Sequence, residues 1–324
     1  MPINVGVVGA GSWGTTVAAM AAENAPTVLW ARRAELAEQI NREHVNGDYL
    51  AAYTLPEQLR ATSSLEEAVR FADVLVMAVP SHGYRDVAAE AARHLRPWVP
   101  VVSLTKGLER GSRKRMSEVT RDEMPGHPVA VLTGPNLAKE ILSGQPAASV
   151  VAVDDPDIAA ELQRIFGRPS LRVYTNTDVV GCEVGGVVKN VIAIAAGITI
   201  GAGLGDSARA ALMTRGYAEM VRLAATLGAR AETLAGLSGF GDLVLTCTSD
   251  QSRNFRYGRA LGAGQSFDPT ITVEGAATAR AVARLAARRG IDMPIASMVA
   301  AMIDGQSDLP TAIQTLLSRP LRKE

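Results

Sequence analysis

Residues 3–14 read INVGVVGAGSWG, and this stretch decides the fold of the first half of the chain. A short β-branched run is followed at once by the pattern G-x-G-x-x-G, formed by Gly9, Gly11 and Gly14, and then by a helical pattern. In this context the first glycine permits a tight turn, the second lets the backbone approach a pyrophosphate, and the third allows close helix-to-strand packing. The free N–H groups of the helix start attract phosphate. The segment predicts a dinucleotide site; a glycine turn without a ligand is the alternative.

The first half of the chain alternates short apolar runs with amphipathic stretches. Helical periodicity marks residues 15–23, 34–43 and 84–95, and the strand-like runs are TVLWA, ADVLVMAVP, VPVVSLT, VAVLT, SVVAV and LRVYTN. Strands that alternate with helices indicate βαβ units. We therefore expect an α/β protein whose N-terminal Rossmann domain, residues 1–177, holds a doubly wound, mostly parallel sheet.

After Asp178 helical patterns replace the strand patterns, over residues 178–200, roughly 207–227, 253–262, 274–289 and 294–303. We expect an all-α C-terminal domain over residues 178–324 that binds the substrate and carries the catalytic groups. Residues 179–204 are apolar enough to suggest a membrane span, but they include Glu183 and Lys189. Because charges are costly at the centre of a bilayer, a buried helix of a globular domain is the favoured interpretation.

The composition argues against several classes of protein. Among 324 residues, 33 Lys and Arg balance 33 Asp and Glu, which removes the long-range field expected of a protein that binds nucleic acid or anionic membranes. Cys182 and Cys247 are too few for a disulfide framework, which suits a reducing compartment, and the four histidines lack metal-ligand spacing. No basic residue precedes Arg32, so export is not indicated. We expect a cytoplasmic protein with no metal, no nucleic-acid partner and no stable membrane insertion.

The second predicted strand ends in WARR, about twenty positions after the glycine pattern, where a residue is expected to meet the adenosine ribose. Arg32 and Arg33 stand there instead of an acidic residue. A guanidinium can bind a ribose 2′-phosphate through two hydrogen bonds, so this pattern favours NADP over NAD. The alternative is that both arginines are solvated at the start of the next helix, where Glu35 would neutralise one of them.

The positions of two lysines indicate roles in ligand binding or catalysis. Lys106 directly follows the VVSLT strand, which delivers it to the sheet edge where open α/β sheets bind ligands. Gly134 and Asn136 follow VAVLT in the same way. Lys189 interrupts the small and apolar run VGCEVGGVVKNVIAIAAG, and burial lowers the pKa of a lysine towards neutrality, where an amine can shuttle protons.

We expect the helical face around Lys189 to carry almost no large side chains. Gly185 and Ala193 lie on that face, so a planar ring or a small substrate would have room to approach the amine. The alternative is that Lys189 pairs with Glu183, but six residues of helix place that carboxylate on the opposite face.

The segment GFGDLVLTCTSDQSRNFRYG, residues 239–258, concentrates polar groups in the second half. We expect Asp242 in a glycine-flanked turn that aims its carboxylate. Ser252 resembles an N-cap, which places Arg253 and Asn254 in the first turn of a helix. A guanidinium, an amide and free N–H groups at one helix start form an anion site, so a small phosphorylated substrate is the favoured partner. Ordinary capping would explain Ser252 alone.

Six segments match one family in order and over nearly the whole chain: GAGSWG at 9–14, KGLE at 106–109, GPNLAKE at 134–140, GGVVKNVIAI at 185–194, GFGDLVLTCTSDQSRN at 239–254 and VEG at 273–275. Together they resemble the bacterial-type NAD(P)-dependent sn-glycerol-3-phosphate dehydrogenases. This set of motifs is far more specific than the glycine pattern alone.

The resemblance implies roles for individual residues. Lys189 looks like the family's proton-transfer lysine, with Asp242 as its charge-balancing partner, and Lys106 resembles the lysine that touches substrate and cofactor. Position 136 is Ser or Thr in some members and Asn here, which leaves its hydrogen-bond role open. The remaining implied substrate contacts are Gly134, Asn136, Ser252, Arg253 and Asn254, and the remaining implied cofactor contacts are Ser12, Trp13, Arg32, Arg33, Ala138, Arg253 and Glu274.

The resemblance also implies an activity: reversible reduction of dihydroxyacetone phosphate to sn-glycerol 3-phosphate, the entry to glycerophospholipid synthesis, with NADPH or NADH. The family and the apolar helical half favour a homodimer. Two other interpretations remain. A β-hydroxyacid dehydrogenase shares the plan but usually places Asn four residues after its lysine, where this chain has Ala193. A non-catalytic NAD(P)H-binding redox sensor would need no buried lysine.

Overall fold

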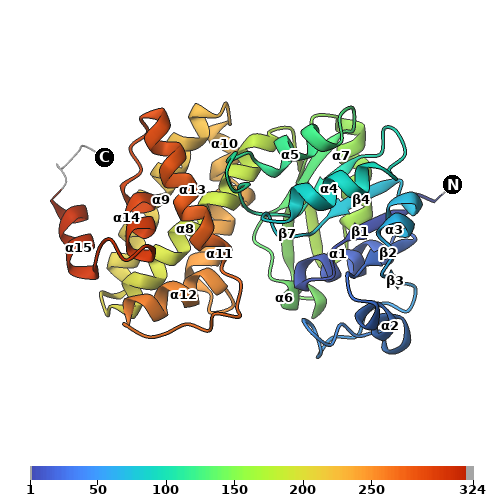
Figure 1. Cartoon of the computed structure of the whole chain (residues 1–324), viewed down its shortest axis with the longest axis horizontal. Helices are drawn as coiled ribbons and strands as arrows, with labels where there is room; N and C mark the ends of the chain where they lie inside the picture. Colours follow the sequence, from blue (N-terminus) through green and yellow to red (C-terminus); the bar gives the residue numbers. More distant parts are fainter. Residues whose placement is uncertain (1, 319–324) are drawn as a thin grey trace. The chain divides into compact units, whose positions relative to one another are not determined.

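The computed structural model describes residues 2–318, which divide into two compact units within Met1–Glu183 and Val184–Glu324 (Figure 1). The division falls inside a long helix, α8 (Val179–Gly201), which begins in the first unit and continues in the second. The domain boundary expected near Thr177 lies just ahead of this helix. The domain limits 1–177 and 178–324 therefore stay a prediction.

The first unit is built on one sheet that has eight strands among the described residues. The strand order is β3-β2-β1-β4-β5-β6-β7-β8; the pairs are parallel except β6 with β7, which is antiparallel. The first six strands have the order 3-2-1-4-5-6 of a Rossmann fold, so the predicted fold class is confirmed. The strands are β1 (Val5–Val8), β2 (Thr27–Trp30), β3 (Arg60–Thr62), β4 (Val74–Met77), β5 (Val101–Ser103), β6 (Val129–Thr133), β7 (Ala147–Ala152) and β8 (Leu171–Asn176).

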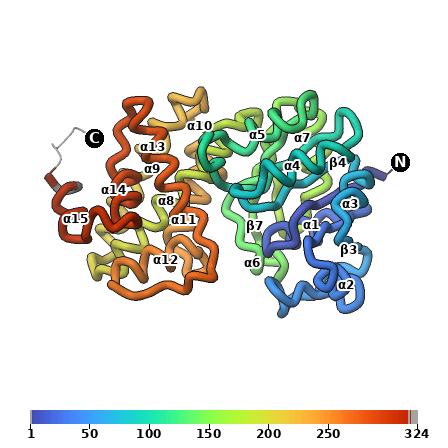
Figure 2. Tube along the Cα trace, in the orientation of Figure 1, coloured from blue at the N-terminus to red at the C-terminus, as the bar shows by residue number. Residues whose placement is uncertain are grey.

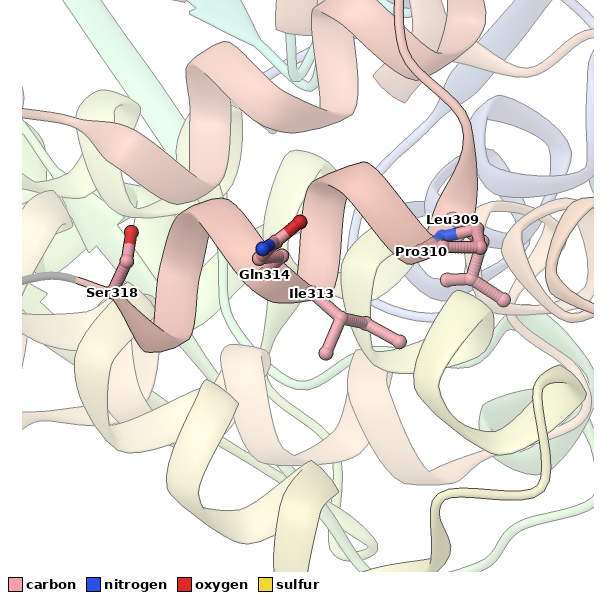
Figure 3. Close-up of a pocket in the computed structure, with 5 residues that line it drawn as sticks. All are labelled: Leu309, Pro310, Ile313, Gln314 and Ser318. Atoms are coloured by element: carbon pink, nitrogen blue, oxygen red, sulfur yellow. The ribbon is translucent and has the colours of Figure 1, made fainter.

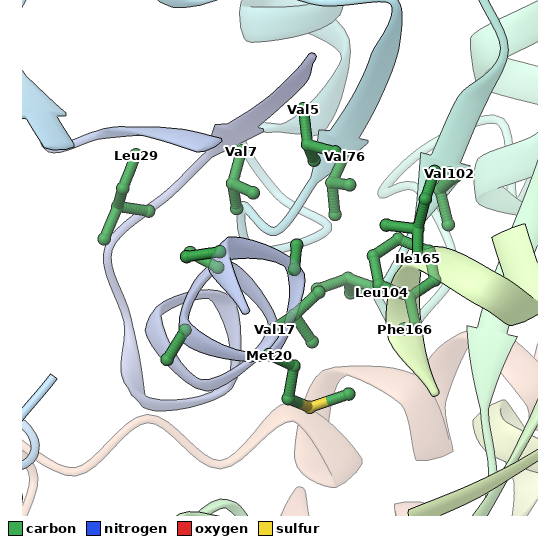
Figure 4. Close-up of a cluster of buried hydrophobic side chains, with 14 of the residues drawn as sticks. Val5, Val7, Val17, Met20, Leu29, Val76, Val102, Leu104, Ile165 and Phe166 are labelled. Atoms are coloured by element: carbon green, nitrogen blue, oxygen red, sulfur yellow. The ribbon is translucent and has the colours of Figure 1, made fainter. Parts of the chain in front are cut away.

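Helices cover both faces of this sheet, because alternate side chains of each strand point to opposite faces. One core joins Val5 and Val7 of β1 to Val17 and Met20 of α1 and to Phe166 of α7 (Figure 4). A second core packs the opposite strand residues against α3, α4 and α5. The helices of the unit are α1 (Ser12–Ala22), α2 (Ala34–Glu43), α3 (Leu65–Phe71), α4 (Tyr84–Ala92), α5 (Met116–Glu123), α6 (Ala138–Leu142) and α7 (Pro156–Phe166).

Among the described residues of the second unit, all of the secondary-structure elements are helices (Figure 2). The five predicted helices are confirmed: three have the predicted bounds, and the ends of the other two differ by one or two residues. The run that was expected to hold a glycine-flanked turn is also helical. Beyond α8, the elements are α9 (Gly205–Thr226), α10 (Ala231–Ala235), the π-helical turn η1 (Leu237–Gly241), α11 (Asp242–Thr248), α12 (Arg253–Gly262), α13 (Glu274–Arg289), α14 (Pro294–Ile303) and α15 (Leu309–Leu317).

Helix α8 is the core helix of the second unit. Among the described residues it is long and apolar enough to cross a bilayer, but 89% of its most apolar window is buried inside the protein. Glycines let α12 approach it closely: a Cβ added at Gly258 would lie 2.0 Å from the carbonyl oxygen of Ile194, and one at Gly197 would lie 2.1 Å from that of Phe255. The prediction of a buried globular helix is confirmed.

An open pocket lies along α15, and none of the residues that line it is ionisable. Figure 3 shows the side chains that line it: Leu309, Pro310, Ile313, Gln314 and Ser318. This lining offers neither a charge for phosphate nor a group for proton transfer.

A buried carboxylate joins α9 to α14. Glu219, 2% exposed, accepts hydrogen bonds from the backbone N–H groups of Ile295 at 2.7 Å and Ala296 at 3.2 Å, in the first turn of α14. The pKa of Glu219 is raised to about 7, mainly by burial and to a smaller extent by the charge of Asp292. The two backbone N–H groups and Arg222 oppose this rise. The carboxylate thus satisfies helix donors at an electrostatic cost.

This raised pKa predicts that the protein loses stability as the pH rises through the range from about 4.5 to about 7. In that range the folded state holds a proton on Glu219 that the unfolded state has released, so the unfolding free energy falls with pH, by about 3 kcal/mol in all. Denaturant titrations at pH 5 and pH 8 measure the change. In Glu219→Gln the difference between the two pH values should shrink by about this amount; an unaltered difference would contradict the assignment.

Candidate active site

The glycine turn after β1 has the geometry that dinucleotide binding needs. Gly9 has φ +120°, and a Cβ at Gly14 would lie 2.0 Å from the Gly9 carbonyl oxygen, so both positions require glycine. In contrast, no described atom lies within 4 Å of a Cβ built at Gly11. The first and third glycines are therefore used for the turn and for helix packing, and the second leaves open space beside the N-terminus of α1. Ser12 and Trp13, also singled out, are half-buried at this helix start.

The two arginines after β2 are exposed, as expected of residues that meet the outer end of a cofactor. Arg33 is the N-cap of α2 and forms an ion pair with Asp48. In the alternative interpretation of the sequence, Glu35 would neutralise one of these arginines, but the carboxylate that pairs with Arg33 is Asp48, from the loop after α2. The structure thus leaves Arg32 and Arg33 in different electrostatic surroundings.

The loops after β5 and β6 meet at the carboxyl edge of the sheet. The amine of Lys106 donates to the carbonyl oxygen of Gly134 at 3.2 Å, which joins the two predicted loops. Gly134 has φ +123°, a conformation that L side chains rarely adopt. Ala138, two residues after Asn136, is the first residue of α6.

The side chain of Asn136 is oriented by Ser149. The Ser149 hydroxyl donates to Asn136 Oδ1 at 2.9 Å, so the amide nitrogen is the free end of the group. This Nδ2 is buried and has no hydrogen-bond partner among the described residues. Because an unsatisfied buried N–H₂ costs free energy, the position is suited to donate to a ligand. The end of Asn136 that is available to a ligand is therefore the N–H₂ group, a hydrogen-bond donor.

In the second unit Lys189 is buried and paired. Its side chain is 8% exposed, and its amine donates to Asp242 Oδ1 at 2.5 Å and to the hydroxyl of Thr246 at 2.8 Å. The Thr246 hydroxyl in turn donates to the Asp242 carbonyl oxygen at 2.6 Å. Asp242 and Thr246 are one helical turn apart, so α11 presents both oxygens to the amine. The alternative pairing of Lys189 with Glu183 is excluded.

Two sequence expectations about this region are wrong. Asp242 does not sit in a turn: η1 leads directly into α11, and Asp242 is the first residue of that helix. The face of α8 beside Lys189 is not open at Gly185 either, since a Cβ there would lie 2.3 Å from the carbonyl oxygen of Ser238. The small residue lets the backbone of η1 pack closely, which brings the start of α11 and therefore Asp242 to the lysine.

The predicted phosphate site lies at the start of α12. Ser252 is its N-cap, with the hydroxyl accepting from the backbone N–H of Phe255 at 3.2 Å, as predicted. Arg253 is exposed, and Asn254 Oδ1 accepts from the N–H of Gly275 at 2.9 Å. This bond leaves the amide nitrogen of Asn254 as the end that can donate to an anion.

The start of α13 joins this phosphate site to the helix of Lys189. A Cβ added at Gly275 would lie 2.7 Å from Asn254 Oδ1 and 2.8 Å from the carbonyl oxygen of Asn190. Asn190 directly follows Lys189 in α8, and Glu274 is the first residue of α13. The second unit thus brings the helix of the buried Lys189 close to the predicted anion site at the start of α12.

The amino-terminal end of α8 is held by a buried carboxylate. Glu183 accepts from Arg115 Nη1 at 2.6 Å, from the N–H of Ser117 at 2.8 Å and from the Ser117 hydroxyl at 2.5 Å. Burial raises the pKa of Glu183, opposed by the Arg115 guanidinium and the Ser117 donors. Glu183 and Lys189 both belong to α8, so the contacts of Glu183 fix the first turns of the helix that carries Lys189.

Two family models cover most of the chain. The model described as the N-terminus of NAD-dependent glycerol-3-phosphate dehydrogenase matches residues 4–159, and the model described as its C-terminus matches residues 178–314. The chain belongs to this family. Its membership decides among the three interpretations of the sequence, because it makes the chain an NAD(P)-dependent oxidoreductase and leaves the β-hydroxyacid dehydrogenase and the non-catalytic sensor unsupported.

Curated and solved glycerol-3-phosphate dehydrogenases resemble the chain over its full length. It is 54% identical to "Glycerol-3-phosphate dehydrogenase [NAD(P)+] 2" of Sphingopyxis alaskensis, over 100% of this chain and 99% of that protein. It is 51% identical to "Glycerol-3-phosphate dehydrogenase [NAD(P)+]" of Cereibacter sphaeroides, over 99% and 100%. The crystal structure of glycerol-3-phosphate dehydrogenase from Coxiella burnetii matches with a TM-score of 0.92 and 37% identity, over 98% of this chain and 99% of that one.

The first unit of this family member fits the dinucleotide that the family name requires. The open space at Gly11 lies beside the free N–H groups at the start of α1, where a pyrophosphate is expected to bind. A side chain that filled this space would have excluded the pyrophosphate. Arg32 and Arg33 follow the second strand, where the ribose is expected.

The sequence did not single out three of the groups that build the site in this dehydrogenase. The sequence could have indicated Thr246, because it lies four residues after Asp242 and therefore one turn along a helix. No local pattern in the sequence indicates Arg115 as the partner of Glu183, because 68 residues separate the two. Asp48, the partner of Arg33, lies in a loop with no motif.

Proposed function

We propose that Lys189 and Asp242 form the proton-transfer pair of this dehydrogenase and that Ser252, Arg253 and Asn254 bind the phosphate of its substrate. The chain is an NAD(P)-dependent oxidoreductase that acts on the CH–OH group of glycerol 3-phosphate. In the direction of reduction, the ketone is dihydroxyacetone phosphate and the product is sn-glycerol 3-phosphate.

One observation carries the assignment of the proton donor: a lysine amine, almost wholly buried, that is held by a carboxylate and a hydroxyl. A buried ammonium is costly unless it is paired, and a salt bridge with Asp242 lowers that cost. Such a pair adds little stability compared with an apolar pair of similar size. Its retention in the core is therefore best explained by chemistry.

Within this pair each residue has a separate task. The Lys189 ammonium donates a proton to the carbonyl oxygen as that oxygen gains charge, and in the reverse direction the neutral amine accepts the proton of the C2 hydroxyl. Asp242 stabilises the ammonium, and Thr246 fixes the direction of its N–H bonds by accepting one of them. When the cofactor is bound, its nicotinamide supplies or accepts the hydride at C2.

The phosphate contacts are assigned to the first turn of α12. The N-terminus of this helix has a positive dipole end, Arg253 adds a full charge, and the amide nitrogen of Asn254 is turned outward by the bond of its oxygen to Gly275. Binding a dianion there holds the rest of the substrate, which contributes to turnover as well as to affinity.

Lys106, Gly134 and Asn136 are assigned to the substrate and the nicotinamide end, and Arg32 and Arg33 to the adenosine end. The two arginines favour NADPH. We further propose that the enzyme acts in the cytoplasm as a homodimer and supplies glycerophospholipid synthesis. The family supports all three points, and the apolar helical unit supports the homodimer.

The activity is tested by one absorbance assay. Purified protein mixed with dihydroxyacetone phosphate and NADPH should oxidise the cofactor, seen as a loss of absorbance, and NADH should support a slower reaction. Dihydroxyacetone without the phosphate should be a poor substrate, with kcat/KM lower by more than ~1000-fold, because the dianion site is then empty. Equal rates with the two ketones would contradict the phosphate assignment, and no oxidation with either cofactor would contradict the activity.

A further inference from the structure

The loop after α2 is anchored on the glycine turn. The side chain of Asn46 is fully buried, and its Nδ2 donates to the carbonyl oxygen of Ala10 at 3.0 Å and to the hydroxyl of Thr15 at 2.8 Å. Ala10 lies between Gly9 and Gly11, so Asn46 ties the loop to the phosphate-binding turn. The backbone of this loop is thereby placed beside the cofactor segment of the first unit.

Neighbouring residues fix the loop further. The N–H of Gly47 donates to Gln39 Oε1 of α2 at 3.3 Å, and Leu50 is buried at 1% exposure. Asp48 therefore stands between anchored residues, and its side chain is 40% exposed. Its direction towards Arg33 follows from the fold of the loop as well as from the attraction of the two charges.

The ion pair of Asp48 with Arg33 uses the same guanidinium that a 2′-phosphate would use. Both side chains are largely exposed, at 40% for Asp48 and 56% for Arg33, so the pair is weak and can exchange for a stronger one. A 2′-phosphate must displace this carboxylate or bind next to it, and the two groups repel each other. A ribose 2′-hydroxyl carries no charge and meets no such penalty.

We propose that Asp48 is a specificity-determining residue that weakens the enzyme's preference for NADP over NAD. The inference rests on the proposed placement of Arg33 at the adenosine end of the cofactor. In many NAD sites the acidic residue follows the second strand directly. Here arginines occupy that place, and the negative charge comes from the loop after α2. Asp48 and Arg33 together allow both cofactors to be used.

The test is direct binding to the full-length protein, measured by calorimetry with NADP+, NAD+ and adenosine 2′,5′-bisphosphate. Asp48→Asn should bind NADP+ and the bisphosphate about fivefold to tenfold more tightly, as expected for removing one charge within several ångströms of a dianion. Its affinity for NAD+ should not increase. The gain should shrink as salt is raised, because these charges are exposed, whereas a purely structural effect would not follow ionic strength. The ratio of kcat/KM for NADPH over NADH should rise by the same factor.

Glu35→Gln is the matched control, since Glu35 is an exposed carboxylate in the first turn of the same helix, α2. It should leave both affinities unchanged. An unchanged NADP+ affinity in Asp48→Asn, with a weakened one in Arg33→Ala, would overturn the role of Asp48 while the placement of Arg33 stands. If Arg32→Ala and Arg33→Ala both bind NADP+ as the parent protein does, the proposed adenosine site itself is wrong.

Discussion

Replacing Lys189 by alanine is expected to lower kcat by about 100-fold to 10,000-fold, the range that removal of a positioned general acid produces. The amine is buried and held at 2.5 Å from Asp242 Oδ1 and 2.8 Å from Thr246 Oγ1, so alanine removes a proton donor that its neighbours hold in a fixed position. The dissociation constant for NADP+ should stay close to that of the parent protein. Steady-state rates and calorimetric titrations on the same preparation measure both quantities.

The Lys189→Ala variant also leaves Asp242 buried without its amine, and breaking a buried pair costs about 3–5 kcal/mol of stability. Melting curves are therefore needed, and Lys189→Ala/Asp242→Asn removes the uncompensated charge. This double variant should recover stability and remain inactive. Lys139→Ala, an exposed lysine of α6, is the control and should keep full activity. Activity in either Lys189 variant above about a tenth of the parent value would remove Lys189 from proton transfer.

Replacing Arg253 by alanine is expected to lower kcat/KM for dihydroxyacetone phosphate by about 100-fold to 1000-fold. A guanidinium that binds a phosphate through charge-assisted hydrogen bonds contributes a few kcal/mol, and a factor of ten corresponds to about 1.4 kcal/mol. Part of the loss should appear in kcat, because the phosphate also positions the ketone. Initial rates over a range of substrate concentrations separate the two constants.

The control for this prediction lies on the same helix. Arg259 is an exposed arginine of α12 that pairs with Asp250 at 2.7 Å, and its replacement by alanine should change kcat/KM little. With dihydroxyacetone as substrate, Arg253→Ala and the parent protein should react at similar rates, since there is no phosphate to bind. An equal loss with both ketones would mean that Arg253 acts on the cofactor or on the fold and does not bind the substrate phosphate.

The strongest predictions from the sequence were those in which local pattern and chemistry agree. The glycine turn combines an apolar strand, three spaced glycines and a helix, and each glycine has the surroundings expected of its position. The N-cap at Ser252 depends only on its own turn, and it is confirmed. Lys189 was recognised because a charge within an apolar helix requires an explanation.

Several elements were missed although the sequence carried a signal for them. Helix α3 has Ser64 as its N-cap, and the Ser64 hydroxyl accepts from the N–H of Glu67 at 3.2 Å. Helix α7 has Asp155 as its N-cap, followed by Pro156. Both are ordinary helix starts. Strand β3 is different, since its three residues, Arg60–Thr62, are too short and too polar to show a period of two.

The partners of the site residues were the hardest to predict. Asp242 was expected to be aimed by a turn, and it is aimed by a helix, because close packing at Gly185 brings η1 against α8. The pair of Arg33 with Asp48 depends on how a loop folds over the glycine turn. Such contacts arise from tertiary packing, which no local pattern in one sequence records.

The central claim is that the Lys189 amine meets the oxygen of the reacting carbonyl. A crystal structure of the protein with NADP+ and dihydroxyacetone phosphate tests it most directly, because the oxidised cofactor and the ketone cannot react with each other. Lys189 Nζ is expected within about 2.6–3.2 Å of the carbonyl oxygen, with the phosphate at Arg253 and Asn254. A ketone oxygen held by other groups, out of hydrogen-bond reach of the Lys189 amine, would show that Lys189 is not the proton donor.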